Sequence, residues 1–234
     1  MPIGIIINVS SVLIGGLIGT FLKRYISKDL KNSLPTIFAF AAICIGILSL
    51  SKLDSLTIVI ISFIVGTICG ELFHIEQKIN NVIEKSVSKY IKTNDLNNDK
   101  FFMTEITIAI AIFCFSGTGI FGAMLEGMIG DSSILISKSV LDFFTAMVFA
   151  ASIGIIIPAL SIFQLGTYLI LFYLGMFIEP IMIDSTTANF NAIGGIITIV
   201  LGFELMKFKN IRVLNTIPSF VLVLLISYLV NLLS

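Results

Sequence analysis

Two charged residues one helical turn apart stand out in a long apolar stretch of the chain. Lys138 and Asp142 are separated by four positions, so they share one face of a helix. A carboxylate within a membrane span is costly and is a functional-site hypothesis by default, with the ammonium as its counter-ion. The chemistry that this pair could perform is reversible binding of a proton or a cation at Asp142. The alternative is that both residues lie near the membrane surface and only pair with each other.

A second candidate is a run of small polar residues at 116–119. The thirteen residues 103–115 before it would rise only ~20 Å as a helix. The break therefore falls at membrane depth, where irregular backbone is tolerated if it is buried or lines a polar cavity. The candidate substrate- or ion-binding residues are Asn8, Ser116, Gly117, Thr118, Gly119, Glu126, Asp131, Lys138, Ser139, Asp142, Thr145 and Asn191. No pattern of metal ligands is recognised, and the question of a metal stays open.

The composition is that of an integral membrane protein. Of the 234 residues, 57% are apolar and 12% are charged, with a mean hydropathy of +1.09, whereas soluble domains carry about 25% charged residues. The 14 Lys and Arg residues balance the 14 Asp and Glu residues, which argues against a nucleic-acid partner. The expected partners are the lipid bilayer and a small-molecule or ionic substrate.

Uncharged stretches predict eight membrane spans. A 30 Å hydrocarbon core needs ~20 residues per helix. The longest stretch, 143–178, is too long for one helix, and Pro158 followed by Gln164 predicts a turn within it. A fifth span that begins near Ile134 brings Lys138 and Asp142 into or near the bilayer. The predicted fold is an all-α polytopic bundle with broken or re-entrant segments, and the stretches are 3–22, 34–51, 55–70, 106–125, 143–178, 185–203 and 213–234.

Basic residues predict the orientation. With eight spans, twelve Lys and Arg residues fall on one side of the membrane, and only Lys52 and Lys138 fall on the other. Because cytoplasmic loops collect positive charge, we expect an even number of crossings with the N- and C-termini outside the cytoplasm. An amphipathic helix is predicted from His74 onward, flat on the inner headgroups, followed by an exposed loop at Thr93–Lys100.

A weak internal repeat divides the chain. A shift of 156 residues places spans 1, 2 and 3 on spans 6, 7 and 8, and it matches Gly19 with Gly175 and Gly46 with Gly202. An odd number of crossings separates the two units, so the repeat would have inverted topology, as in many secondary transporters. The predicted parts are a first three-helix repeat (1–73), an amphipathic helix and linker (74–102), a central broken-helix segment (103–160) and a second repeat (161–234).

Small residues at four-residue spacing predict close helix packing in spans 1 and 3. The two stripes are Ser11, Gly15 and Gly19, and Ser62, Gly66 and Gly70. Packing within the chain is the favoured interpretation, and a homodimer contact is the alternative.

The chain resembles the YqgA-like bacterial membrane proteins, grouped as domain of unknown function 554. The elements GAMLEGMIGDSS, KSVLDFF and VFAASIGI carry the resemblance, and INVSSVLIGGLIGTFLKR, SFIVGTICGEL, AIGGIITIVLGFELM and IRVLNTIPSF extend it over nearly the whole chain. The resemblance implies a multi-pass protein of the bacterial inner membrane and stresses the region from Gly130 to Asp142. It implies no reaction or substrate. The chain departs from the family in having Phe143 where members tend to have Gly.

The leading functional hypothesis is a small secondary transporter, coupled to an ion gradient, that moves a small polar or ionic solute. Its site would lie near the membrane midplane at the broken fourth span and the fifth span, with a coupling H⁺ or Na⁺ and no cofactor. A passive channel or a structural membrane protein is the alternative. An enzyme is not expected, because the single histidine, His74, is not part of an HExxH motif and the chain has no P-loop,.

Overall fold

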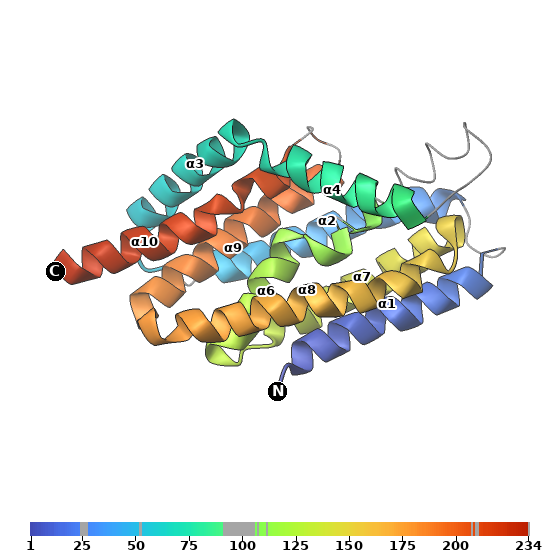
Figure 1. Ribbon diagram of the computed structural model, residues 1–234, viewed down its shortest axis with the longest axis horizontal. Helices are drawn as coiled ribbons and strands as arrows, with labels where there is room; N and C mark the ends of the chain where they lie inside the picture. Colours follow the sequence, from blue (N-terminus) through green and yellow to red (C-terminus); the bar gives the residue numbers. More distant parts are fainter. Residues whose placement is uncertain are drawn as a thin grey trace.

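The structure is a computed structural model that describes residues 1–23, 28–51, 53–90, 106, 108–110, 112–206, 208 and 211–233. All regular secondary structure within these ranges is helical, which confirms the predicted all-α polytopic bundle (Figure 1). The elements are α1 (Ile3–Phe21), α2 (Lys28–Leu50), α3 (Leu56–Leu72), α4 (Ile75–Tyr90), α6 (Gly117–Ile129), α7 (Ser133–Ile153), α8 (Ile156–Ile178), η1 (Glu179–Ile181), α9 (Asp184–Leu205), η2 (Val213–Thr216) and α10 (Pro218–Leu233).

Six helices of the described chain are long and apolar enough to cross a membrane, and a bent pair could make a seventh. The bent pair joins α3 to the first part of α4 at an angle of 54°. The apolar part of α2, Thr36–Leu50, is shorter than the rest. Of the eight predicted spans, the two that fall short of this length on their own are thus α2 and α3, which has 17 residues and rises about 25 Å as a helix.

Three residues with positive φ separate consecutive helices. Gly130 (φ 73) ends α6 and Gly154 (φ 75) ends α7, while His74 (φ 50) lies at the bend between α3 and α4. The turn in the stretch 143–178 is therefore at Gly154, and its prediction from Pro158 and Gln164 was wrong. Pro158 occupies the first turn of α8, where its missing N–H breaks no helical hydrogen bond, and Gln164 lies inside α8.

The glycine stripes pack helices together within the chain. Gly15 and Gly19 place α1 directly against the carbonyl oxygens of Phe143 and Met147 on α7. Gly66 places α3 against the backbone N and Cα of Ser219 in α10, and Gly70 places it against the carbonyl oxygen of Asn215 in η2. In Figure 1, α1, α7 and α8 lie together, and α3 runs beside α10. The predicted homodimer therefore draws no support from these stripes.

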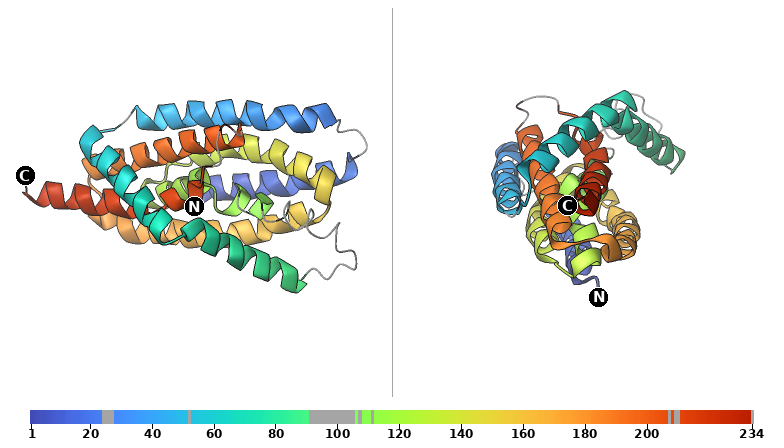
Figure 2. Two further views of the ribbon diagram at one scale, coloured as in Figure 1. Left: turned by 90° about the horizontal axis from the view of Figure 1, so that it is seen from above. Right: turned by 90° about the vertical axis from the view of Figure 1, so that its left-hand side faces the viewer.

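The start of α4 is fastened to η2. The Glu76 N–H donates to Asn215 Oδ1 (2.8 Å), and the Leu214 N–H donates to Glu76 Oε2 (3.2 Å). At the same place, Arg212 pairs with Glu71 at the end of α3 (2.9 Å). Figure 2 shows α4 on one side of the bundle and α2 on the other. The predicted loop at Thr93–Lys100 lies outside the described residues.

We expect Gly19→Ala to lower the thermal stability of the protein, because its Cβ would collide with the Met147 carbonyl oxygen. Overpacking of this kind typically costs about 1–3 kcal/mol. Gly166→Ala is the matched control, since a Cβ at Gly166 meets nothing within 4 Å, and replacing a helical glycine by alanine is typically favourable by about 0.5–1 kcal/mol. Circular dichroism melting in detergent measures both variants. Equal melting temperatures for the two variants would contradict the close α1–α7 contact.

Candidate functional site

A buried polar cluster joins three helices, α1, α7 and α8. Lys138 Nζ donates to both carboxylate oxygens of Asp142, at 2.6 and 2.5 Å. Asn8 Nδ2 on α1 donates to Asp142 Oδ2 (2.9 Å), and Gln164 Nε2 on α8 donates to Asn8 Oδ1 (2.7 Å). None of the four residues is more than 3% exposed. We call Asn8, Lys138, Asp142 and Gln164 the polar cluster.

The glycines of α1 bring the polar cluster together. Asn8 lies on the same side of α1 as Gly15 and Gly19, which let the backbone of α1 approach α7 closely,. Asp142 is near the centre of α7, with nine helix residues before it and eleven after it. Gln164 is similarly central in α8, with eight residues before it and fourteen after it. The polar cluster is therefore far from the ends of both helices.

Most of the hydrogen-bonding capacity of the polar cluster is satisfied by its own members. The exception is Gln164 Oε1, a buried acceptor with no hydrogen-bond partner among the described residues. An unmet buried acceptor typically costs about 1–3 kcal/mol. This oxygen can accept a hydrogen bond or coordinate a cation.

Tyr168, one turn after Gln164 on α8, connects the polar cluster to the helix break at 116–119. Its hydroxyl donates to the Phe113 carbonyl oxygen (2.7 Å) and lies against Gly119. Ser116 is the N-cap of α6, where its Oγ accepts from the Gly119 N–H (3.2 Å) and from Thr118 Oγ1 (3.4 Å). At the break in the fourth span, α6 thus begins at a hydrogen-bonded N-cap, and the buried side chain of Tyr168 lies beside it.

Three of the candidate residues serve local packing. Ser139 and Thr145 donate to backbone carbonyl oxygens of the preceding turn of α7, at 2.7 and 2.8 Å, as serine and threonine often do within helices. Gly117 lies against the side chain of Ile197 on α9. None of the three has a hydrogen bond to the polar cluster among those the structure shows.

Glu126 caps the first turn of α1 and lies apart from the polar cluster. Its carboxylate is buried and accepts from the N–H groups of Gly4 (2.7 Å) and Ile5 (3.1 Å) and from Ser132 Oγ (2.8 Å). A negative charge at a helix N-terminus satisfies free N–H groups and interacts favourably with the helix dipole. The sequence grouped Glu126 with Asp142, but the structure gives it this separate role.

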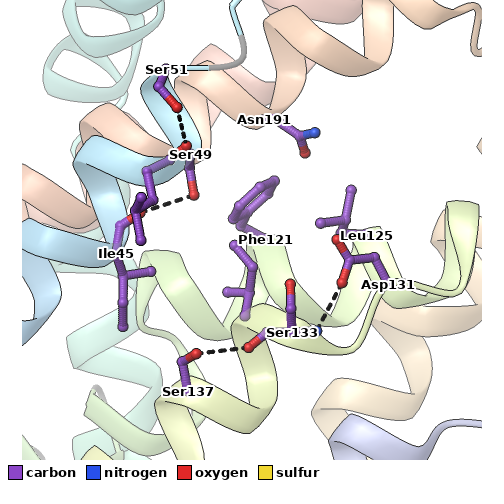
Figure 3. Close-up of a pocket in the computed structure, with 11 residues that line it drawn as sticks. Ile45, Ser49, Ser51, Phe121, Leu125, Asp131, Ser133, Ser137 and Asn191 are labelled. Atoms are coloured by element: carbon purple, nitrogen blue, oxygen red, sulfur yellow. Dashed lines mark hydrogen bonds between the residues drawn. The ribbon is translucent and has the colours of Figure 1, made fainter.

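Asp131 and Asn191 line a cavity of about 320 Å³ between α2, α6, α7 and α9 (Figure 3). The cavity contains none of the four members of the polar cluster among its lining residues. The twelve candidate residues therefore divide between the polar cluster, the adjoining helix break, the cap of α1, local bonds in α7 and this cavity.

Sequence reasoning missed Gln164 and Tyr168. The signal available for Gln164 was its isolation in a long apolar stretch, which was taken to indicate a turn. Tyr168 had no such signal, because tyrosine is common in apolar helices. In the described part of the chain, no group of three or more His, Cys, Asp or Glu side chains is placed to hold a metal ion.

Comparisons with known proteins identify the family. The family model described as "Protein of unknown function (DUF554)" matches residues 3–228. The chain is 37% identical over 227 residues to "Uncharacterized protein YqgA" of Escherichia coli (strain K12), covering 97% of each chain. It is 24% identical over 220 residues to "Uncharacterized membrane protein YdfK" of Bacillus subtilis (strain 168), covering 92% of this chain and 91% of the other. No solved structure matches. The chain therefore belongs to the DUF554 family of membrane proteins.

Proposed function

We propose that this chain is a small secondary transporter for a small polar or ionic solute, driven by an ion gradient, with Asp142 as the residue that carries the coupling H⁺ or Na⁺. The observation that carries the proposal is the buried Lys138–Asp142 pair with its two amide neighbours. Well-packed apolar residues of similar volume are often at least as stabilising as a buried ion pair. A membrane helix that retains both charges therefore points to a use for them beyond stability.

The geometry of the polar cluster supports exchange between Lys138 and an incoming cation. Protonation of Asp142 would cancel its charge and release the Lys138 ammonium from it. A Na⁺ ion could instead take the place of the ammonium, bound by the Asp142 carboxylate and by Gln164 Oε1, because hard cations prefer oxygen ligands. Both events change the charge at the junction of α1, α7 and α8, which is where a conformational change could be coupled to binding.

The proposed inverted repeat is supported by contacts between residues 156 positions apart. Gln164 and Asn8 have this separation and are hydrogen-bonded to each other. Ser219 and Phe63 have the same separation, and Ser219 Oγ donates to the Phe63 carbonyl oxygen (3.3 Å). Each pair joins a helix of the first predicted repeat to its counterpart in the second, α1 to α8 and α3 to α10.

The pair α2 and α9 follows the same relation. The two helices begin at Lys28 and Asp184, which are also 156 positions apart. Gly46 lies against Ile199 on α9, and the equivalent contact occurs between Gly202 and Ile43 on α2.

Together these contacts support a two-fold axis that passes between Asn8 and Gln164. In transporters built from inverted repeats, the substrate and coupling-ion sites lie near the bilayer midplane at the interface of the repeats. The polar cluster has this position in the proposed architecture. The excess of basic residues on one side supports the proposed orientation in a bacterial inner membrane, with both termini outside the cytoplasm.

We expect Asp142→Asn alone to destabilise the protein, because it leaves the Lys138 ammonium buried without a counter-charge. Removing one member of a buried pair typically costs about 3–5 kcal/mol. The double variant Lys138→Met/Asp142→Asn should recover most of this loss, since the new amide can still accept from Asn8 Nδ2. Melting curves in detergent compare the three proteins. A double variant no more stable than the single one would contradict this account of the pair.

The double variant should also abolish ion-coupled proton movement. Proteoliposomes that contain a pH-sensitive dye would be exposed to Na⁺, K⁺ and pH gradients, and the wild-type protein should move protons in response to one of the cation gradients. The control is Glu71→Gln/Arg212→Met, which removes an ion pair of the same net charge. That pair is 44–46% exposed, so its loss should leave the flux unchanged.

Three results would contradict the proposal. Wild-type flux that persists in Lys138→Met/Asp142→Asn would remove the polar cluster from the mechanism. Absence of proton movement under every gradient would remove H⁺ coupling, and stepwise single-channel currents in planar bilayers would indicate a passive pore.

A further inference from the structure

The cavity that Asp131 and Asn191 line is at the end of the bundle where α2 ends and α7 begins. Figure 3 shows the lining side chains of α2, α7 and α9, with Phe121 of α6 between them. Its volume of about 320 Å³ is within the range of sites for small organic ligands and is far larger than one ion needs.

Several polar atoms of this cavity are available as hydrogen-bond acceptors. Asn191 Oδ1 is buried and has no partner among the described residues. The hydroxyl groups of Ser49, Ser51 and Ser137 each donate to a backbone carbonyl oxygen of their own helix, at 3.1, 2.8 and 2.9 Å. Because their protons are used in this way, these hydroxyls offer lone pairs to the cavity.

Asp131 supplies the negative charge. One of its carboxylate oxygens accepts from the Ser133 N–H (2.9 Å) at the start of α7, and the second oxygen can still accept from a ligand. Among the lining residues, Asp131 carries the formal charge. The remaining walls are apolar and come from Ile45, Leu48, Phe121, Leu125 and Ile134.

We propose that this cavity binds a small organic cation, namely a primary ammonium group on a short apolar body. The ammonium has three donors and no acceptor, which matches a carboxylate oxygen, an unpartnered amide oxygen and serine lone pairs. The apolar body matches the walls. The site uses no residue of the polar cluster, so the inference does not depend on proton or Na⁺ exchange at Asp142.

The test is a titration of the detergent-solubilised protein with n-butylammonium at constant ionic strength, followed by saturation-transfer NMR. n-Butanol and butyrate are matched probes with the same body and no positive charge. We expect saturable binding of n-butylammonium and no saturable binding of n-butanol or butyrate. In Asp131→Asn and in Asn191→Leu, the Kd should rise by at least about tenfold, since each variant removes an acceptor for a charged donor.

Asp184→Asn is the control variant, because this exposed carboxylate at the start of α9 does not line the cavity and its loss changes the net charge equally. Binding should be unchanged in it. Circular dichroism melting establishes that all three variants are folded.

The ammonium group could belong to a free amine or to a lipid headgroup. Competition of phosphatidylethanolamine, but not phosphatidylcholine, with n-butylammonium in mixed micelles would identify the lipid as a source of the same chemistry. Equal binding of n-butanol, binding unaffected by Asp131→Asn and Asn191→Leu, or no saturable binding in either arm would overturn the proposal.

Discussion

The Lys138–Asp142 ion pair constrains the rest of the bundle, because hydrocarbon cannot solvate either charge. Every surface of the pair has to be covered by protein. α1 covers one side and contributes the Asn8 amide, while α8 covers another and contributes Gln164. The glycines of α1 are needed for this cover. A larger side chain at Gly15 or Gly19 would hold α1 away from α7 and admit lipid to the pair.

A second carboxylate, Glu126, holds α1 through hydrogen bonds to its backbone. It binds the free N–H groups of the first turn of α1, whereas Asp142 binds a side chain further along the same helix. α1 is therefore fixed along its axis by Glu126 and in rotation by Asn8. Two carboxylates that look alike in the sequence thus separate into one that positions a helix and one whose ionic partner lies on its own helix.

Properties that depend on a single segment of the chain could be predicted from the sequence. The apolar composition, the helical class, the buried charges at Lys138 and Asp142 and the break at Ser116 were all predictable from local patterns. Gln164 was misassigned because a polar residue in an apolar run has the same local signature at a turn and at a buried contact. Its partner is Asn8, 156 positions away. The contact of Glu126 with the first turn of α1 was missed for the same reason, since Gly4 is 122 positions away.

The i, i+4 spacing of Lys138 and Asp142 has a consequence for biosynthesis. One partner of this pair is synthesised before it and the other after it, because Asn8 precedes α7 in the chain and Gln164 follows α7. During insertion, α7 reaches the membrane before α8 does. Since the two charges can pair within α7 itself, that helix presents a net neutral surface to the translocation machinery. If the carboxylate and the ammonium were on separate helices, each charge would remain unpaired until the other helix had been inserted.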